Sequence, residues 1–224
     1  IAIIETGMGG EDDATNIITP ILSVITNIGF DHMGILGNSL KQIAKHKSGI
    51  IKENVPLVMA PNQKSSVKAV IKKTCKKLNA KLYDAGECKI RYSDTNVDFM
   101  SFIIKSPNIY FRIKSKMLGR HQAENMATAL YAIDRLRNLS YSIDYSDIKH
   151  VLTNIQIEGR MNYNKKQNIL IDASHNHSGV EELKNVICEN FADKKIILIC
   201  SIYKTKEIKM MVKEYKKFVD FVVV

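Results

Sequence analysis

The chain has 224 residues, of which 45% are hydrophobic and 25% charged, and its formal net charge is +10. This composition is typical of globular proteins, and the length suits one large domain or two ordinary ones. No apolar run approaches the ~20 residues needed to cross a bilayer and no secretory signal pattern opens the chain, so we expect a cytoplasmic protein without a membrane partner.

The chain opens with an apolar run, Ile1 to Ile4, that leads into Glu5 and then into the glycine-rich segment 7–10. A short continuous apolar run predicts a strand that is buried on both faces of a parallel sheet. Glu5 would stand at the carboxyl end of this strand, where open parallel sheets bind ligands. The alternative is a strand-end charge that only reaches solvent. Another strand is predicted at 218–224, and with strands at both ends we expect an internal segment of a longer protein.

A second strand is predicted at about 23–28, and Asp31 and His32 follow it. Because neighbouring parallel strands lie ~4.8 Å apart, Glu5 and His32 could converge on one point. A carboxylate and an imidazole suit a divalent metal, with Mg²⁺ or Mn²⁺ favoured where phosphates complete the coordination shell. The alternative for His32 is a helix-capping or core histidine that bonds to the backbone.

The spacing Ser39-x-x-Gln42 is a capping box that opens a helix. Its apolar stripe contains Leu40 and Ile43, and Lys47 is the next position on that stripe. Burial would disfavour the charged ammonium and leave a neutral amine that can act as a nucleophile or take up carbon dioxide. The alternative is that only the stem of Lys47 is buried, while the amine reaches water or the last carbonyls of the helix.

A third strand is predicted at 55–60, followed by a helix in which Val67, Ile71 and Cys75 recur at helical spacing. A solvated face explains the lysines of this helix, whereas a nucleic-acid surface would rest on charge alone, because no aromatic residues lie among them. We therefore expect no nucleic-acid partner. These lysines carry most of the positive excess and are Lys64, Lys68, Lys72, Lys73, Lys76 and Lys77.

The alternation of strand and helix is typical of a doubly wound parallel sheet. Two alternating runs, 97–103 and 109–113, flank Ser106-Pro107-Asn108 and predict an antiparallel hairpin in a small appended sheet. A long helix is expected to begin within 118–125. Its predicted core face is Met126, Ala129, Leu130, Ile133 and Leu136. A short helix should follow, and its predicted inward residues are Ile148, Val151, Leu152 and Ile155.

His121 and Asn125 share a side near the start of the long helix. An amide at that place can bond both a donor and an acceptor, which recognition of an adenine edge requires. The alternative is simple helix capping, which we prefer for His121.

The segment 157–160 is interpreted as a joint between two domains, residues 1–156 and 157–224. The second domain is expected to contain strands at 168–173 and 195–203, each followed by a helix. Asp172 and His175 stand at the carboxyl end of the first of these strands, and Arg160 lies on the joint. Two α/β units that offer polar groups across a hinge are typical of an enzyme with a cleft.

Six stretches of sequence, in this order along the chain, match the motifs of one enzyme family. They are Ile4 to Gly10 with Asp13-Ala14-Thr15-Asn16, Gly29-Phe30-Asp31-His32, Lys47-Ser48-Gly49-Ile50-Ile51, Leu118-Gly119-Arg120-His121-Gln122 with Asn125, Gly159-Arg160, and Asp172-Ala173-Ser174-His175-Asn176. The chain resembles the folylpolyglutamate synthases and dihydrofolate synthases, which are Mur-type ATP-dependent amide ligases. The resemblance implies an α/β fold with a mostly parallel, doubly wound Mur-ligase central domain, a small antiparallel sheet and a Rossmann-like C-terminal domain, both domains being truncated.

The resemblance also implies a reaction and its site. ATP would convert a carboxylate of a folate or dihydropteroate into an acyl phosphate, which the amine of L-glutamate then attacks. Glu5 and His32 would be Mg²⁺ (or Mn²⁺) ligands, and Lys47 would be carbamylated and help hold a metal or orient phosphate. The remaining implied contacts are Gln122 and Asn125 with adenine, Arg160 with the ATP phosphates in a catalytic role, Asp172 and His175 with the ribose and phosphates, and Asp13 with the pterin-bearing substrate.

Several positions depart from the family pattern. The phosphate-binding loop G-x-x-x-x-G-K-[ST] is absent; in the family it lies upstream of this segment, so we expect the segment alone to be inactive. Glu11 stands where the family has arginine, Glu158 where it has proline and Ser201 where it has glycine. Two alternatives stay open: another Mur-type ligase, such as one that builds cell-wall peptide or cyanophycin, or a nucleotide-binding relative without catalysis. We expect a monomer.

Overall fold

The structure is a computed structural model that describes residues 1–204 and 206–224. Within it the chain forms two compact units. Unit 1 comprises Ile1–Lys89, Ser106–Ile109 and Glu124–Ile143, and unit 2 comprises Ile90–Lys105, Tyr110–Ala123 and Asp144–Val224. The domain boundary expected at residue 157 stays a prediction.

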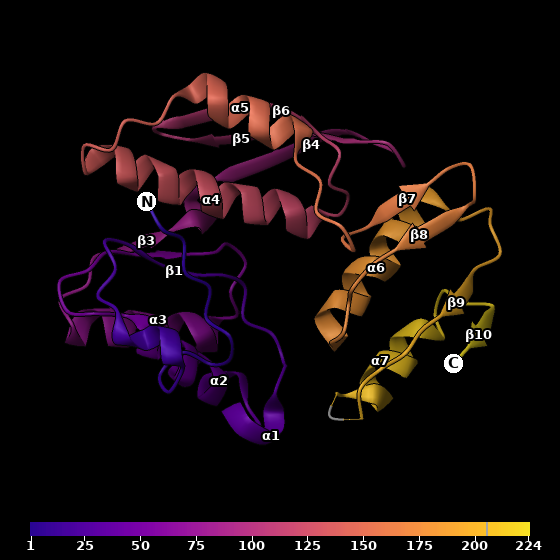
Figure 1. Ribbon diagram of the computed structural model, residues 1–224, viewed down its shortest axis with the longest axis horizontal. Coiled ribbons are helices and arrows are strands. Elements are labelled where there is room, and N and C mark those ends of the chain that lie inside the picture. The colour runs from indigo at the N-terminus through magenta and orange to yellow at the C-terminus, as the bar shows by residue number, and fades with distance from the viewer. Residues whose placement is uncertain (205) are drawn as a thin grey trace. The chain divides into compact units, whose positions relative to one another are not determined.

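Helices and strands alternate along much of the described chain (Figure 1). The α-helices are α1 (Met33–Leu36), α2 (Leu40–Lys47), α3 (Ser65–Lys77), α4 (Arg120–Asn138), α5 (Tyr145–Asn154), α6 (His177–Asn190) and α7 (Ile208–Tyr215), and the 3-10 helices are η1 (Ala14–Ile17), η2 (Ser48–Ile50) and η3 (Ala85–Glu87). The strands are β1 (Ser23–Ile25), β2 (Leu57–Met59), β3 (Leu82–Asp84), β4 (Lys89–Thr95), β5 (Met100–Ser106), β6 (Ile109–Ser115), β7 (Asn162–Asn164), β8 (Ile169–Ile171), β9 (Ile197–Ile199) and β10 (Phe221–Val223).

The core of unit 1 is built around a parallel sheet with the strand order β1-β2-β3. The central strand β2 is buried at all three positions, as a strand with neighbours on both sides and helices over its faces requires. The side chains of Ile43 and Ile71, on α2 and α3, are fully buried in the same cluster. The parallel sheet predicted from the alternation of strands and helices is confirmed.

The strand predicted for Ile1 to Ile4 is wrong. These residues pair with no strand in the described part of the chain, and Ile1, Ile3 and Ile4 are 75%, 94% and 53% exposed. An apolar run becomes a strand only where a neighbouring strand takes up its backbone hydrogen bonds. In the described part of unit 1, β1 and β3 each pair only with β2, and the run adds to neither of these two sheet edges.

The helices α2 and α3 follow from local signals. Ser39 caps α2 by accepting from the backbone N–H of Gln42, and the Gln42 side-chain oxygen accepts from Asn38 N at 2.9 Å. This is close to the predicted capping box. In α3, Val67, Ile71 and Cys75 are buried while most of the lysines are exposed, as predicted.

A three-stranded sheet, β4-β5-β6, carries the predicted hairpin. The two-residue turn at Pro107 and Asn108 joins β5 to β6. Burial alternates strictly along β6, where Ile109, Phe111 and Ile113 are buried, as the period of a strand with one covered face requires.

The long helix α4 begins within the predicted segment, and Met126 and Leu130 are buried as predicted, but the rest of its buried face differs. Ala129 is exposed, whereas Ala127, Tyr131 and Asp134 are buried. In α5, Ile148 and Leu152 are buried as predicted, but Val151 is 51% exposed. Apolar residues are frequent on protein surfaces, so hydrophobicity alone does not fix which face of a short helix is covered.

The C-terminal part of unit 2 forms two small sheets instead of one. The strands β9 and β10 pair in parallel, whereas β8 pairs antiparallel with β7, a strand that the sequence did not predict. Val180 and Met211, on α6 and α7, are fully buried in the core beside these strands. The mixed α/β fold is thus confirmed, and no helix among the described residues has the length and hydropathy needed to span a membrane.

Candidate functional site

The glycine-rich turn after Glu5 lies directly against the C-terminal end of α2. The backbone N–H of Glu11 donates to the carbonyl of His46 at 2.9 Å. A Cβ added at Gly10 would lie 2.9 Å from that carbonyl oxygen, and one added at Gly49 would lie 2.4 Å from Glu11 Cα. Only glycines allow this close approach, which brings the loop of the first motif to the motif that contains Lys47.

Asp13 shapes the same loop. Its carboxylate accepts from Met8 N at 2.8 Å, from Thr15 N at 3.0 Å and from the Thr15 hydroxyl at 2.6 Å. These hydrogen bonds, the one from the Thr15 hydroxyl foremost, lower the pKa of Asp13 to about 2. Asp13 is therefore an anionic cap of η1, and its contact with a substrate stays a prediction.

A pocket of about 220 Å³ lies where the glycine-rich loop, α1 and the end of α2 meet. Ile35 and Leu36 of α1 line one side, and His46 lines another. His46 Nδ1 lies 4.0 Å from a carboxylate oxygen of Asp12. The sequence analysis missed His46, although its place directly before Lys47 was a usable signal. The pocket lining is completed by Met8, Gly9, Gly10, Asp12, Asp13 and Ala14.

The three residues expected to hold or orient the metal all belong to unit 1. Glu5 is exposed, and its side chain makes no hydrogen bond or ion pair within the described chain. His32 begins α1 in the left-handed conformation, at φ 51°, and its Nε2 lies 3.8 Å from Asp31 Oδ1. Lys47 is the last residue of α2 and is half-buried. The burial that we expected for Lys47 is therefore only partial.

The donor chemistry of Glu5 and His32 fits a divalent cation. A carboxylate oxygen and an imidazole nitrogen are ordinary ligands of Mg²⁺ and Mn²⁺, and Mg²⁺ normally keeps waters and substrate phosphates as its other ligands. The imidazole of His32 makes no capping hydrogen bond, which removes the helix-capping alternative that we considered for it. Lys47 becomes a comparable oxygen ligand only as a carbamate.

The first turn of α4 holds Gln122 in a buried environment. The Gln122 side-chain nitrogen lies 3.0 Å from His121 Nε2, and His121 Nδ1 lies 3.3 Å from a carboxylate oxygen of Glu182 on α6. His121 thus contacts two side chains and does not act as a simple cap. Asn125, one turn later, is exposed. The adenine contacts of Gln122 and Asn125 stay predictions.

In unit 2 the last two motifs lie side by side. Ala173 N donates to Gly159 O at 2.7 Å, and Asp172 accepts from Met161 N at 3.1 Å. Arg160 is exposed at this turn, and so is His175 at the end of β8. The structure therefore brings together Arg160, Asp172 and His175 around one pair of loops. Their roles toward a nucleotide stay predictions.

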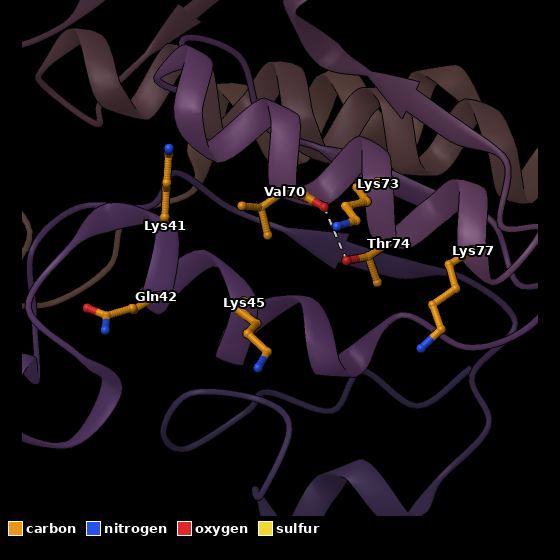
Figure 2. Close-up of a pocket in the computed structure, with 7 residues that line it drawn as sticks. All are labelled: Lys41, Gln42, Lys45, Val70, Lys73, Thr74 and Lys77. Atoms are coloured by element: carbon orange, nitrogen blue, oxygen red, sulfur yellow. Dashed lines mark hydrogen bonds between the residues drawn. The ribbon is translucent and has the colours of Figure 1, made fainter.

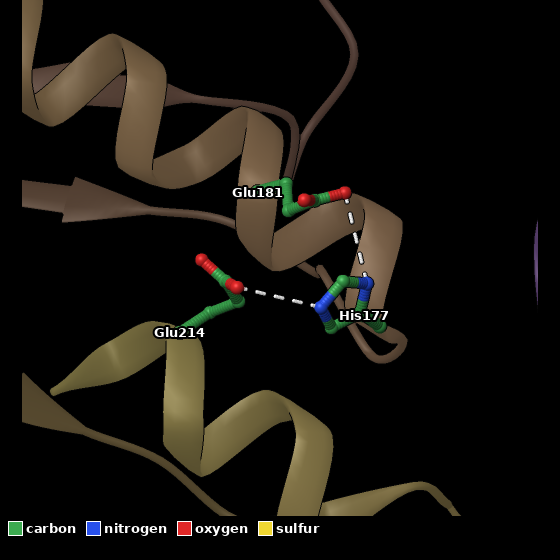
Figure 3. Close-up of side chains that lie close together, drawn as sticks. All are labelled: His177, Glu181 and Glu214. Atoms are coloured by element: carbon green, nitrogen blue, oxygen red, sulfur yellow. Dashed lines mark ion pairs between the residues drawn. The ribbon is translucent and has the colours of Figure 1, made fainter. Parts of the chain in front are cut away.

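A second polar cluster joins α6 to α7 (Figure 3). His177 Nε2 lies 3.5 Å from Glu214 Oε1, and His177 Nδ1 lies 3.6 Å from Glu181 Oε2. Glu214 is buried and accepts from Lys217 at 2.6 Å and from Lys184 at 3.2 Å. Lys217 first, and then Lys184, lower the pKa of Glu214 to about 2. These lysines already balance the carboxylate, so this cluster links two helices and is a poor place for a cation.

A model of the Mur ligase middle domain matches residues 1–133. The chain belongs to this family. It is 34% identical over 218 residues to the dihydrofolate synthase/folylpolyglutamate synthase of Bacillus subtilis, and the match covers 94% of this chain and 50% of that relative. It is also 32% identical over 220 residues to the probable dihydrofolate synthetase of Schizosaccharomyces pombe, covering 95% of this chain and 51% of the relative.

A solved structure of the Mycobacterium tuberculosis folylpolyglutamate synthase, complexed with ADP and AMPPCP, superimposes on this Mur-family chain with a TM-score of 0.88. Its sequence is 25% identical, and the match covers 98% of this chain and 50% of that one. The chain spans about half the length of the curated relatives that it matches. The predicted resemblance to folylpolyglutamate and dihydrofolate synthases is confirmed.

Proposed function

We propose that the protein is an ATP-dependent ligase that joins L-glutamate to a carboxylate of a folate or dihydropteroate. The observation that supports this most is the contact of the glycine-rich loop with the end of α2, beside a pocket lined by that loop and by residues that follow the second motif and precede the third. The glycine-rich loop, α1 and α2 come from separate parts of the sequence, yet their residues line one pocket. The names of the relatives favour a folate substrate over cell-wall peptide or cyanophycin.

The reaction proceeds in two steps. A carboxylate oxygen of the folate attacks the γ-phosphorus of ATP, ADP leaves, and an acyl phosphate forms. The glutamate amine then attacks the acyl carbon, phosphate leaves, and the amine proton is released. Phosphoryl transfer of this kind requires mainly positioning and electrostatic stabilisation from the protein.

The side chains of this chain supply those effects. Glu5 and His32 hold Mg²⁺ or Mn²⁺, which offsets charge on the phosphate oxygens. Lys47 would carry a carbamate, formed when its amine takes up carbon dioxide and loses a proton, and the new carboxylate would help hold the metal or orient phosphate. Arg160 contacts the phosphates, Asp172 and His175 bind the ribose and phosphates, and Gln122 and Asn125 contact adenine. Asp13 lies toward the pterin. We propose that the reaction takes place in the cytoplasm and that the enzyme is a monomer.

The test is phosphate release by the full-length protein in the presence of ATP and L-glutamate, with dihydropteroate and tetrahydrofolate compared side by side. We expect release that depends on both glutamate and one or both pterins. Phosphate release that depends on neither glutamate nor a pterin would contradict the proposed ligase. Phosphate release that requires a peptide precursor of the cell wall would assign the protein to another Mur-type activity.

Substitutions at Lys47 test the carbamate. Lys47→Ala should nearly abolish turnover, and added bicarbonate should not restore it. Lys47→Arg keeps the positive charge and the long stem but cannot form a carbamate, so it should be as inactive as Lys47→Ala. Lys72→Ala, on the exposed face of α3, is the matched control and should keep normal turnover. An active Lys47→Arg enzyme would remove the carbamate role while leaving the ligase assignment in place.

A further inference from the structure

A groove of about 400 Å³ lies between α2 and α3 in unit 1, and it is separate from the pocket described above. Two lysines from each helix line it: Lys41 and Lys45 from α2, and Lys73 and Lys77 from α3 (Figure 2). The ammonium groups are spread along the groove and do not meet at one point. Such spacing suits a ligand with several separate negative groups better than a single phosphate.

No carboxylate balances these lysines. Neither α2 nor α3 contains an acidic residue, and none of the four lysines forms an ion pair in the described part of the chain. By contrast Lys68, on the same helix α3, pairs with Asp84 at 3.2 Å. Like charges four residues apart on a helix repel one another, and each helix contributes one such pair to the groove. A bound anion would relieve this repulsion.

Helix dipoles account for only half of the lysines. Lys45 and Lys77 lie in the last turns of α2 and α3, where a positive charge interacts favourably with the helix carbonyls. Lys41 lies in the first turn of α2, where the dipole opposes a positive charge, and Lys73 lies in the middle of α3. The helix dipoles therefore do not account for Lys41 and Lys73, which are exposed.

Of the other polar groups of the groove, Gln42 leaves a donor for a ligand, whereas the Thr74 hydroxyl has its donor occupied. The Gln42 side-chain oxygen accepts from Asn38 N and from the Ser39 hydroxyl, so its NH₂ group is the part that remains. The Thr74 hydroxyl donates to Val70 O at 3.1 Å. Val70 is half-buried against the core of unit 1 and supplies an apolar wall, which strengthens charge interactions beside it by excluding water.

We propose that this groove binds a short linear polyanion, whose negative groups pair with the four lysines. Two sources supply this chemistry: the carboxylates of an oligo-γ-glutamate and the phosphates of an inorganic polyphosphate. The carboxylate source rests on the proposed function, because oligo-γ-glutamate is the chain that such a ligase would extend. The phosphate source does not depend on that function.

The test is direct binding, without ATP or turnover, so its result is independent of ligase activity. Fluorescein-labelled penta-γ-glutamate and labelled tripolyphosphate are titrated separately with the protein and followed by fluorescence anisotropy. Lys73→Gln/Lys77→Gln should weaken binding about tenfold, because it removes two of the four positive charges and exposed ion pairs contribute up to about 1 kcal/mol each. Lys72→Gln/Lys76→Gln is the control, because these lysines are exposed on the same helix, have the same spacing and do not line the groove.

Each outcome decides the proposal. Binding of either probe that the groove variant weakens and the control does not supports it and identifies the source. Equal losses in both variants would show attraction to net charge alone and would overturn it, as would binding of neither probe. Tighter, salt-sensitive binding of duplex DNA that both variants weaken would assign the lysines to a nucleic-acid surface instead. Unchanged circular dichroism and melting temperature establish that both variants are folded.

Discussion

Gly49→Ala tests the contact between the glycine-rich loop and the end of α2, on which the candidate site depends. The new methyl carbon would lie 2.4 Å from Glu11 Cα, 2.5 Å from Glu11 Cβ and 2.7 Å from Glu11 N. These atoms belong to backbone or stand next to it, so the loop must move as a whole. Overpacking of this kind costs about 1–3 kcal/mol, and loss of the Glu11 N to His46 O hydrogen bond adds about 1 kcal/mol. We expect a destabilisation of about 2–4 kcal/mol.

Gly34→Ala is the matched control. A Cβ at Gly34 meets no atom within 4 Å, and the residue lies inside α1, so we expect alanine to be neutral or to stabilise by up to about 1 kcal/mol. Urea denaturation followed by circular dichroism measures both variants, and amide hydrogen exchange at Glu11 reports the loop itself. A Gly49→Ala protein whose stability changes by less than about 0.5 kcal/mol, with Glu11 still protected, would refute the close approach of the loop to α2.

Two further predictions concern titration and thiol reactivity. The pKa of Asp13 is lowered from 3.8 to about 2, so its charged form stabilises the fold above about pH 4, and this contribution is lost as the pH falls toward 2. The difference in urea midpoint between the wild type and Asp13→Asn should therefore shrink between pH 4 and pH 2. A difference that stays constant would contradict the role of the Thr15 hydroxyl. Burial raises the pKa of Cys75 and Cys88 to about 11, whereas Cys188 is exposed. A thiol reagent at pH 8 should therefore label Cys188 well before the two buried cysteines, and peptide mass spectrometry measures the labelling of each.

Local signals predicted α2 and α3 well, because the information lies within a few turns of one helix. Ser39 and Gln42 fix the start of α2 through hydrogen bonds between residues three apart. The stripe Val67, Ile71 and Cys75 fixes the buried face of α3. Strands depend on partners that lie far away in sequence, so the run Ile1 to Ile4 looked like β2 in composition and yet pairs with nothing in the described chain.

The candidate site was predictable as a set of motifs but not as an arrangement. No local pattern sets the distance between the glycine-rich loop and α2, and the contact of Glu11 with Gly49 crosses 38 positions. The burial of Glu214 was not predicted from the sequence for a related reason. A glutamate in an amphipathic helix is expected to face solvent, and its burial becomes tolerable only because Lys184 and Lys217 reach it from α6 and from the end of α7.

The charged residues of the candidate site differ in whether their side chains have partners within the described chain. Asp13 and Asp172 each accept two hydrogen bonds from backbone N–H groups, and for Asp172 one of them comes from Met161 in the neighbouring turn, so these bonds explain why a carboxylate stands at those positions. Glu5, Lys47 and Arg160 have no side-chain hydrogen bond or ion pair within the described chain. No partner within the described chain accounts for these three charges, and their roles toward a metal or phosphates stay predictions.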